Sequence, residues 1–353
     1  MARLLPLIII ATGVYFWFKS RRSASSLTDA HPFKRSARSA ELGFLPPEQL
    51  DDQHAGPPIP ERERALAGVR AGDWQQAAAL LADTGQDWER RSMYAYDLGA
   101  AAAKDDGWLL AWESARPDDP DAAVVRARST VVLAWELRGG DWAKNTSGEQ
   151  FDAFHRTLAR SREEITRAAE LNPQDPTPYI TEIATATGFG YSPQEMHRVW
   201  AEVSARAPHH YEAHFMALQY WCAKWCGSDE EAREFAGRAA ADAPLGSLLS
   251  AFPLIAWFEA RLNDSVKDAE YRDPGLTALV EAALVDAAAA PADHPRLVEL
   301  RHLLAYFLYR QGRYDAALEQ FRLVDGYTDA LPWRYYEKRF YVAAREATVR
   351  KAG

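Results

Sequence analysis

The feature that most constrains this sequence is the spacing of three prolines, Pro173, Pro208 and Pro244, which stand 35 and 36 residues apart. Between the last two, residues 211–244 have the composition of a helix, a glycine turn and a second helix. A period of about 34 residues that ends in proline is typical of stacked helix pairs. The spacing therefore favours a stack of helix pairs over a compact catalytic domain.

The rest of the chain after residue 60, which we call the body, has the same helical character. From Glu61 onward Ala, Leu, Glu and Arg dominate, and apolar residues recur three and four positions apart. Glycines and prolines interrupt this pattern at the intervals expected for helices of about 12 to 20 residues. We see no alternating strand pattern. The prediction is an all-α protein with about 14 helices from Glu61 to the C-terminus.

Two segments resemble the tetratricopeptide repeat. The segment Arg310–Phe321 (RQGRYDAALEQF) matches the second half of that repeat, with Gly312 in the turn and Tyr314 at the start of the second helix. Ala317 and Phe321 fall at its small and large packing positions. The segment RAGDWQQAAALL repeats this signature with Gly72, Trp74, Ala77 and Leu81.

This resemblance implies an α-solenoid of antiparallel helix pairs, whose concave face is lined by fixed positions of the first helix of each pair. In one unit the matching positions are Glu212, Phe215, Gln219 and Cys222. In the C-terminal unit they are Glu299, His302, Tyr306, Tyr309 and Arg310.

Tyrosine and arginine are typical of binding hot spots, so these positions are candidate partner-binding residues. The alternative is that Tyr306 and Tyr309 pack against a last helix, Trp333–Lys351, which caps the stack. The segment Trp225–Glu231 also resembles an uncharacterised bacterial family, and that resemblance implies no activity.

The N-terminus predicts a membrane anchor. Residues 4–18 form an uninterrupted apolar run that Lys19, Arg21 and Arg22 follow. Fifteen residues are fewer than the usual minimum of about 17 for a span, but Trp17 and Phe18 suit the interface. A cleaved signal peptide and a buried or interfacial helix are the alternatives. The anchor residues that we single out are Leu4, Ile8, Ile9, Ile10, Trp17 and Phe18.

Positive charge after the apolar run places the body on the cytoplasmic side of an inner membrane, as a single-pass protein. The predicted order is an anchor over residues 1–22, a basic and then proline-rich linker over 23–60, and a helical body over 61–353. The prolines of LPPEQ and GPPIPE make the linker an extended tether.

Charge and cysteine content exclude several functions. The first 40 residues carry a net charge of +6 and the remainder −15, out of −9 in total. Because a phosphate backbone demands clustered Lys and Arg, the acidic body is a poor partner for nucleic acid. Two cysteines fit a reducing compartment. Arg outnumbers Lys about four to one, which suggests a high-GC bacterial genome.

Cys222 and Cys226 lie four residues apart on a predicted helix, so they share one face, about 6 Å apart and too distant for a disulfide. His210 and His214 precede them and suggest zinc. However, a straight helix over residues 210–226 is about 24 Å long, and ligands spread along it do not converge on one ion. We therefore predict no metal site.

Other motifs indicate local structure. Ser228 and Glu231 have the spacing of a capping box around the acidic residues Asp229 and Glu230. Residues 188–192 (GFGYS) lack the third glycine of a dinucleotide loop and predict a turn before a helix that begins at Pro193. No phosphate-binding loop, nucleophile elbow or zinc-protease motif is present, so we predict neither catalysis nor a cofactor.

The resulting hypothesis is a membrane-tethered interaction or scaffolding module that binds a peptide or protein in a concave helical groove. A helical enzyme with a pocket near Cys222 and His214 is one alternative. A soluble structural protein, whose first helix folds onto the body, is another. The identity of the partner and the oligomeric state stay open.

Overall fold

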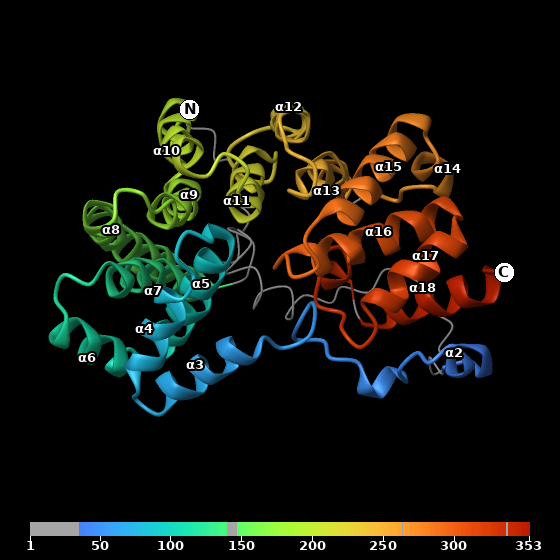
Figure 1. Ribbon diagram of the computed structural model, residues 1–353. Helices are drawn as coiled ribbons and strands as arrows, with labels where there is room; N and C mark the ends of the chain where they lie inside the picture. Colours follow the sequence, from blue (N-terminus) through green and yellow to red (C-terminus); the bar gives the residue numbers. More distant parts are fainter. Residues whose placement is uncertain (1–34, 140–146, 263, 337) are drawn as a thin grey trace. The chain divides into compact units, whose positions relative to one another are not determined.

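The computed structural model describes residues 35–139, 147–262, 264–336 and 338–353. This part of the chain is helical and contains no β-strand, which confirms the all-α prediction (Figure 1). One isolated backbone bridge joins Asp51 to Tyr327. The anchor residues predicted between Leu4 and Phe18 lie outside the described residues. Within them, no helix combines the length and the apolar character that crossing a membrane requires.

The contacts between Cα atoms divide the chain into two compact units. The first unit contains residues 59–236 and the second contains residues 237–353 together with the segment that ends at Pro58. The helices of the first unit are α3 (Pro60–Arg70), α4 (Trp74–Ala82), α5 (Trp88–Lys104), α6 (Gly107–Ala115), α7 (Pro120–Arg138), α8 (Gly148–Leu171), α9 (Thr177–Phe189), α10 (Pro193–Arg206), α11 (Tyr211–Trp221) and most of α12 (Asp229–Ala241).

The helix ends of the first unit follow from local sequence. The side chain of Ser192 accepts a hydrogen bond from the Glu195 amide at the start of α10, and the first residue of that helix is a proline. Gly190 ends α9 in the left-handed conformation that glycine adopts without strain. Residues 188–192 are therefore the turn that the sequence predicts. Ser228 caps α12 in the same way, because its hydroxyl accepts from the Glu231 amide at 3.1 Å.

Both segments that carry the repeat signature form a helix, a turn and a second helix. Gly72 and Gly312 occupy the turns with positive φ, and α4 and α17 (Tyr314–Leu323) begin two residues later. The small and large residues of the signature are buried without exposure between the paired helices: Ala77 and Leu81 in α4, Ala317 and Phe321 in α17.

The second unit consists of helices from the C-terminal part of the chain and of an N-terminal segment that packs against them. Its helices are α2 (Ala37–Glu41), η1 (Pro47–Gln49), η3 (Leu249–Ala251), α13 (Phe252–Ala260), α14 (Asp268–Tyr271), α15 (Pro274–Ala289), α16 (Leu297–Gln311), α17, η4 (Trp333–Tyr335) and α18 (Lys338–Lys351). The predicted last helix thus divides into the turn η4 and the helix α18.

Residues 35–58, which we call the strap, lie within the predicted linker and pack against the second unit. Phe44 and Leu50 are buried against the second unit. The Asp51 amide donates to the Gly326 carbonyl at 2.8 Å, and the Thr328 amide donates back to the Asp51 carbonyl at 2.9 Å. Outside the short helices α2 and η1, the strap has no helical hydrogen bonds of its own, so its backbone polar groups and apolar side chains are available to a neighbouring surface.

Candidate functional site

The cysteines and histidines of the central segment do not lie on one helix, which corrects the prediction for this stretch. Helix α11 ends at Trp221, and Cys222 to Cys226 form a turn in which the Cys226 amide donates to the Tyr220 carbonyl. Both cysteines are free thiols. His210 caps the start of α11 instead of belonging to it. No group of metal-ligating side chains occurs among the described residues.

The environment of these groups is apolar. Burial raises the pKa of the Cys226 thiol to about 11, which disfavours the reactive thiolate. Burial also lowers the pKa of His214 to about 4, and its Nδ1–H donates to the His210 carbonyl at 2.9 Å. His214 packs edge-on against Trp200. These are the properties of core side chains, and they offer no activated nucleophile.

Glu212 and Gln219, predicted to face a concave groove, are buried inside the first unit. The Glu212 carboxylate accepts hydrogen bonds from the Ser92 hydroxyl at 2.7 Å and from Arg128 at 3.2 Å. Phe215 is half-buried on the same helix, and Cys222 is buried just beyond its end. The Glu212 carboxylate of α11 is thus paired with side chains of α5 and α7 inside the unit.

A second buried ion cluster lies in the same unit. Arg91 of α5 donates to Asp175 at 2.6 Å and to Asp121 of α7 at 2.7 Å. Asp175 also accepts from the Thr177 amide at the start of α9. Removing one member of a buried ion cluster typically costs about 3–5 kcal/mol, because an uncompensated charge stays behind. These polar atoms therefore connect the helices of the unit to one another.

The C-terminal candidates divide between the interior and the surface. His302 and Tyr306 are buried, and the Tyr306 hydroxyl lies 2.7 Å from that of Tyr271. Arg310 donates to both hydroxyls at 3.1 Å and its guanidinium stacks 3.9 Å from the Tyr271 ring. Glu299 pairs with Arg296 at 2.9 Å.

The alternative of packing against the chain's end is supported for one of the two tyrosines. The Tyr306 ring lies 5.4 Å from that of Trp333 in η4, whereas half-buried Tyr309 lies beside Tyr314 of α17. The structure brings Tyr306 and Arg310 into one cluster and leaves Glu299 and Tyr309 outside it.

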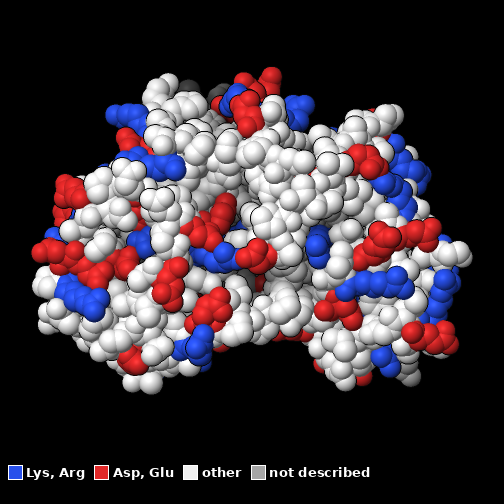
Figure 2. Space-filling view, in the orientation of Figure 1, with Lys and Arg blue, Asp and Glu red and all other residues white. Residues whose placement is uncertain are grey.

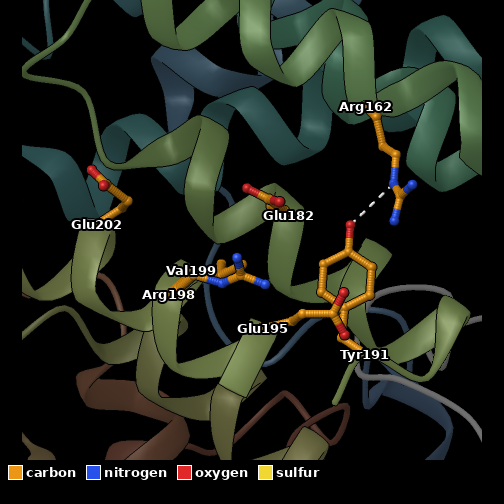
Figure 3. A pocket seen from close by; sticks show the side chains of 7 residues that line it. All are labelled: Arg162, Glu182, Tyr191, Glu195, Arg198, Val199 and Glu202. Carbon is orange, nitrogen blue, oxygen red and sulfur yellow. Dashed lines mark hydrogen bonds between the residues drawn. The ribbon is translucent and has the colours of Figure 1, made fainter. Parts of the chain in front are cut away.

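An open pocket of about 300 Å³ lies on the first unit where α8, α9 and α10 meet (Figure 3). Helix α8 contributes one side chain, α9 another, and α10 presents residues three and four apart, which share one face of the helix. Tyr191 projects from the turn that joins α9 to α10. The lining residues are Arg162, Glu182, Tyr191, Glu195, Arg198, Val199 and Glu202.

Glu182 is the central side chain of this pocket. In the view of Figure 3 its carboxylate lies between Glu202 on one side and Arg162 with Tyr191 on the other. Burial raises the pKa of the half-buried Glu182 carboxyl, Arg162 opposes this effect and the charge of Glu202 adds to it. Neither Glu182 nor the exposed Arg198 forms a hydrogen bond or an ion pair with another described residue.

The other charged groups of the pocket have partners. The Arg162 guanidinium donates to the Tyr191 hydroxyl at 3.1 Å and lies 4.8 Å from the Phe189 ring. Hydrogen bonds from Ser192 lower the pKa of Glu195. Glu202 accepts from Arg206 at 2.6 Å. Glu182 and Arg198 are therefore near opposite charges, those of Arg162 and Glu195, but form no hydrogen bond to any residue that the structure describes.

Sequence reasoning missed this pocket, although one signal was available. Helix α9 reads TPYITEIATATGF, and Glu182 is its single charged residue. The residues around it, including Ile180, Ile183 and Ala186, are fully buried. A lone carboxylate in an apolar helix indicates a position that is kept polar despite burial. The sequence alone did not show which residues face it.

Many other charged side chains form ion pairs with one another. Figure 2 shows acidic and basic residues interspersed over the face drawn. Arg126, in a smaller pocket of about 50 Å³ beside α7, is an example, because it pairs with Glu113 and with Asp106 at 2.8 Å each. Comparisons of the chain with protein-family models, curated proteins and solved structures find no match. The function therefore has to follow from the geometry of the chain itself.

Proposed function

We propose that this chain is a helical-repeat interaction module, similar to tetratricopeptide-repeat proteins, that binds a peptide segment of a partner protein. In this proposal the helix pairs stack as an α-solenoid, and residues 4–18 tether the module to the cytoplasmic face of a membrane. The helix–turn–helix geometry at Gly72 and Gly312 supports the repeat assignment, because buried small residues bring the paired helices together.

One observation carries the binding function. The pocket of α8, α9 and α10 is open, and it holds the half-buried Glu182 and the exposed Arg198, neither of which forms a hydrogen bond to a described residue. A partly desolvated carboxylate without a hydrogen-bond donor, in an accessible pocket, favours a donor from outside the chain. Glu212, His302 and Tyr306 bind within the chain, which favours this pocket over a groove built from them.

Catalysis finds little support by comparison. Thiol chemistry needs a thiolate in an electropositive environment, whereas burial raises the pKa of Cys226 to about 11. The pocket combines carboxylates and guanidiniums with one phenol, which suits recognition of a polar chain segment. A peptide offers both charged side chains and main-chain groups to such a surface.

The test is affinity capture with three forms of the tagged full-length protein, extracted in mild detergent and compared by quantitative mass spectrometry. One form is unaltered, one carries Arg198→Glu, and the control carries Arg156→Glu. Arg156 is exposed on the same α8 as Arg162 but does not line the pocket. We expect a set of partners that Arg156→Glu retains unchanged and whose capture Arg198→Glu alters by about tenfold, because this reversal changes the charge of the pocket lining.

Two results would contradict the proposal. Equal capture by both charge-reversed forms would place binding elsewhere on the chain. Failure of the unaltered protein to enrich any protein over an untagged control would remove the interaction function itself.

A further inference from the structure

We propose that the pocket of α8, α9 and α10 recognises a basic side chain, a lysine or an arginine of the bound peptide, and that Glu182 is the residue that pairs with it. This inference rests on the peptide-binding function proposed above and specifies its ligand. Three features support it: the charge of the lining, the partial burial of Glu182 and an arginine that already binds Glu202 beside the pocket.

The lining carries more negative than positive charge. Three carboxylates, those of Glu182, Glu195 and Glu202, face two guanidiniums. Arg162 is directed to Tyr191, as the dashed line in Figure 3 marks, so its hydrogen-bonding capacity is partly used. The remaining base, Arg198, is exposed to solvent. Because water screens an exposed charge more than a half-buried one, the field of Glu182 dominates inside the pocket.

Burial makes Glu182 the preferred position for a cation. A carboxylate that loses water on folding, without gaining a donor, is held at a free-energy cost. The raised pKa of Glu182 has this origin, since desolvation is its largest cause. An ammonium or guanidinium group restores the missing hydrogen bonds, and charge-assisted bonds of this kind are roughly twice as strong as neutral ones.

The chain itself supplies an example of such binding. Arg206 of α10 stacks 4.4 Å from the ring of Tyr179 and donates to Glu202 at 2.6 Å. Tyr179 precedes Glu182 by three residues on α9, so the two side chains share one face of that helix. The surface between α9 and α10 thus already holds one guanidinium between an aromatic ring and a carboxylate. A ligand cation at Glu182 repeats this arrangement one turn along.

The direct test measures the binding of two fluorescent peptides to the full-length protein. Both are acetylated and amidated, with the sequence Gly-Gly-X-Gly-Gly, where X is arginine in one and citrulline in the other. Citrulline keeps the shape of arginine but lacks its charge. We expect the arginine peptide to bind at least about tenfold more tightly.

Two variants assign the preference to a residue. Glu182→Gln keeps the size and removes the charge, so it should abolish the difference between the two peptides. Glu163→Gln makes the same change at an exposed position of α8 outside the pocket, and it should leave the difference intact. Thermal unfolding of each variant confirms that it folds.

The possible results distinguish a failure of this inference from a failure of the proposed peptide-binding function. Equal binding of both peptides to the unaltered protein overturns the inference, and so does a preference that survives in Glu182→Gln. If capture of partners depends on Arg198 while the arginine preference is absent, the pocket binds peptides but not through a cation.

The pH dependence of peptide binding to the unaltered protein provides a second test. Its preference for arginine should weaken as the pH is lowered from neutral, and at a higher pH than an exposed glutamate would require, because burial raises the pKa of the Glu182 carboxyl.

Discussion

At the scale of single residues, the buried charges of this protein differ in whether the chain supplies a counter-ion. Asp175 is fully buried and pairs with Arg91, and Glu212 receives Ser92 and Arg128. Glu182 is less buried, yet no described residue donates to it. A paired internal charge holds helices together, whereas an unpaired one at a pocket is available to a ligand. This difference is why the proposed site lies at Glu182.

His302 provides a pH-dependent prediction at the same scale. Its Nε2–H donates to the Ala55 carbonyl of the strap at 2.9 Å, and the buried Nδ1 has no partner among the described residues. Burial lowers its pKa from 6.5 to about 4. In the unfolded chain the ring takes up a proton below about 6.5, but in the folded chain only near 4. The unfolded state therefore binds more protons between these values, and folding stability falls as the pH is lowered through this window.

The expected loss between pH 7 and pH 4 is on the order of 3 kcal/mol from this group. The substitution His302→Gln keeps a hydrogen-bond donor for the Ala55 carbonyl and removes the titrating group. The free energy of unfolding of the second unit can be measured in denaturant at pH 7 and pH 5, with hydrogen exchange as the probe. The decrease of this free energy between the two pH values should be smaller for His302→Gln than for the unaltered chain. An equal pH effect in both would assign the acid sensitivity to other groups.

At the scale of elements, α9 owes its position to close packing against α8. A Cβ atom placed on Gly188 would lie 2.5 Å from Leu158 Cδ2 and 2.8 Å from Phe154 Cζ. Both side chains belong to α8 and are buried, so they have little room to move. Helix α9 carries Glu182 and α8 carries Arg162, so this contact joins two of the helices that line the pocket.

Gly188→Ala should therefore destabilise the first unit by about 1–3 kcal/mol through overpacking. Gly237 offers a matched control, since it lies in α12 and a Cβ atom placed on it would have nothing within 4 Å. Gly237→Ala should stabilise the protein by about 0.5–1 kcal/mol, because alanine is the better helix former. Denaturant midpoints check both signs, and two shifts in the same direction would refute the packing argument.

The elements also show where sequence reasoning succeeds and where it fails. The turns at Gly72, Gly190 and Gly312 are predictable, because glycine adopts positive φ there without a steric penalty. The end of α11 at Trp221 is not, since WCAKWC contains no residue that breaks a helix. Trp225 packs edge-on against Trp135, at 5.8 Å between ring centroids, and this distant contact accompanies the turn.

At the scale of the whole molecule, the chain enters its second unit twice, first as the strap and again after α12 begins. Ser36 and Ser39 donate to Glu346 of α18 at 3.0 and 2.7 Å. The Arg345 guanidinium lies 5.2 Å from the ring of Phe44. The strap is thus part of this unit, although its hydrogen bonds to His302 of α16 and to Glu346 of α18 join residues 247 and 310 positions apart in sequence.

Deletion of residues 1–58 should consequently destabilise the second unit. Loss of the buried Phe44 and Leu50 side chains alone removes about 3–6 kcal/mol of apolar burial. Hydrogen exchange should show faster exchange in α16 and α18, with α5 and α7 unchanged. Deletion of residues 1–34 keeps the strap and serves as the control. If the two deletions leave α16 and α18 equally protected, the strap contributes nothing to stability.

The helical class, the turns and most helix starts were decided by the sequence itself, because caps, glycine turns and apolar periods act between residues only a few positions apart. The tertiary structure alone decided which charged groups are paired. Arg91 meets Asp175 across 84 residues and Ser92 meets Glu212 across 120. The repeat resemblance assigned Glu212 to a binding face, but in the structure it accepts hydrogen bonds inside the first unit. Glu182, which the sequence did not single out, lines a pocket. The burial and the pairing of a charged side chain depend on neighbours that only the folded chain brings together, so they cannot be predicted from the local sequence pattern.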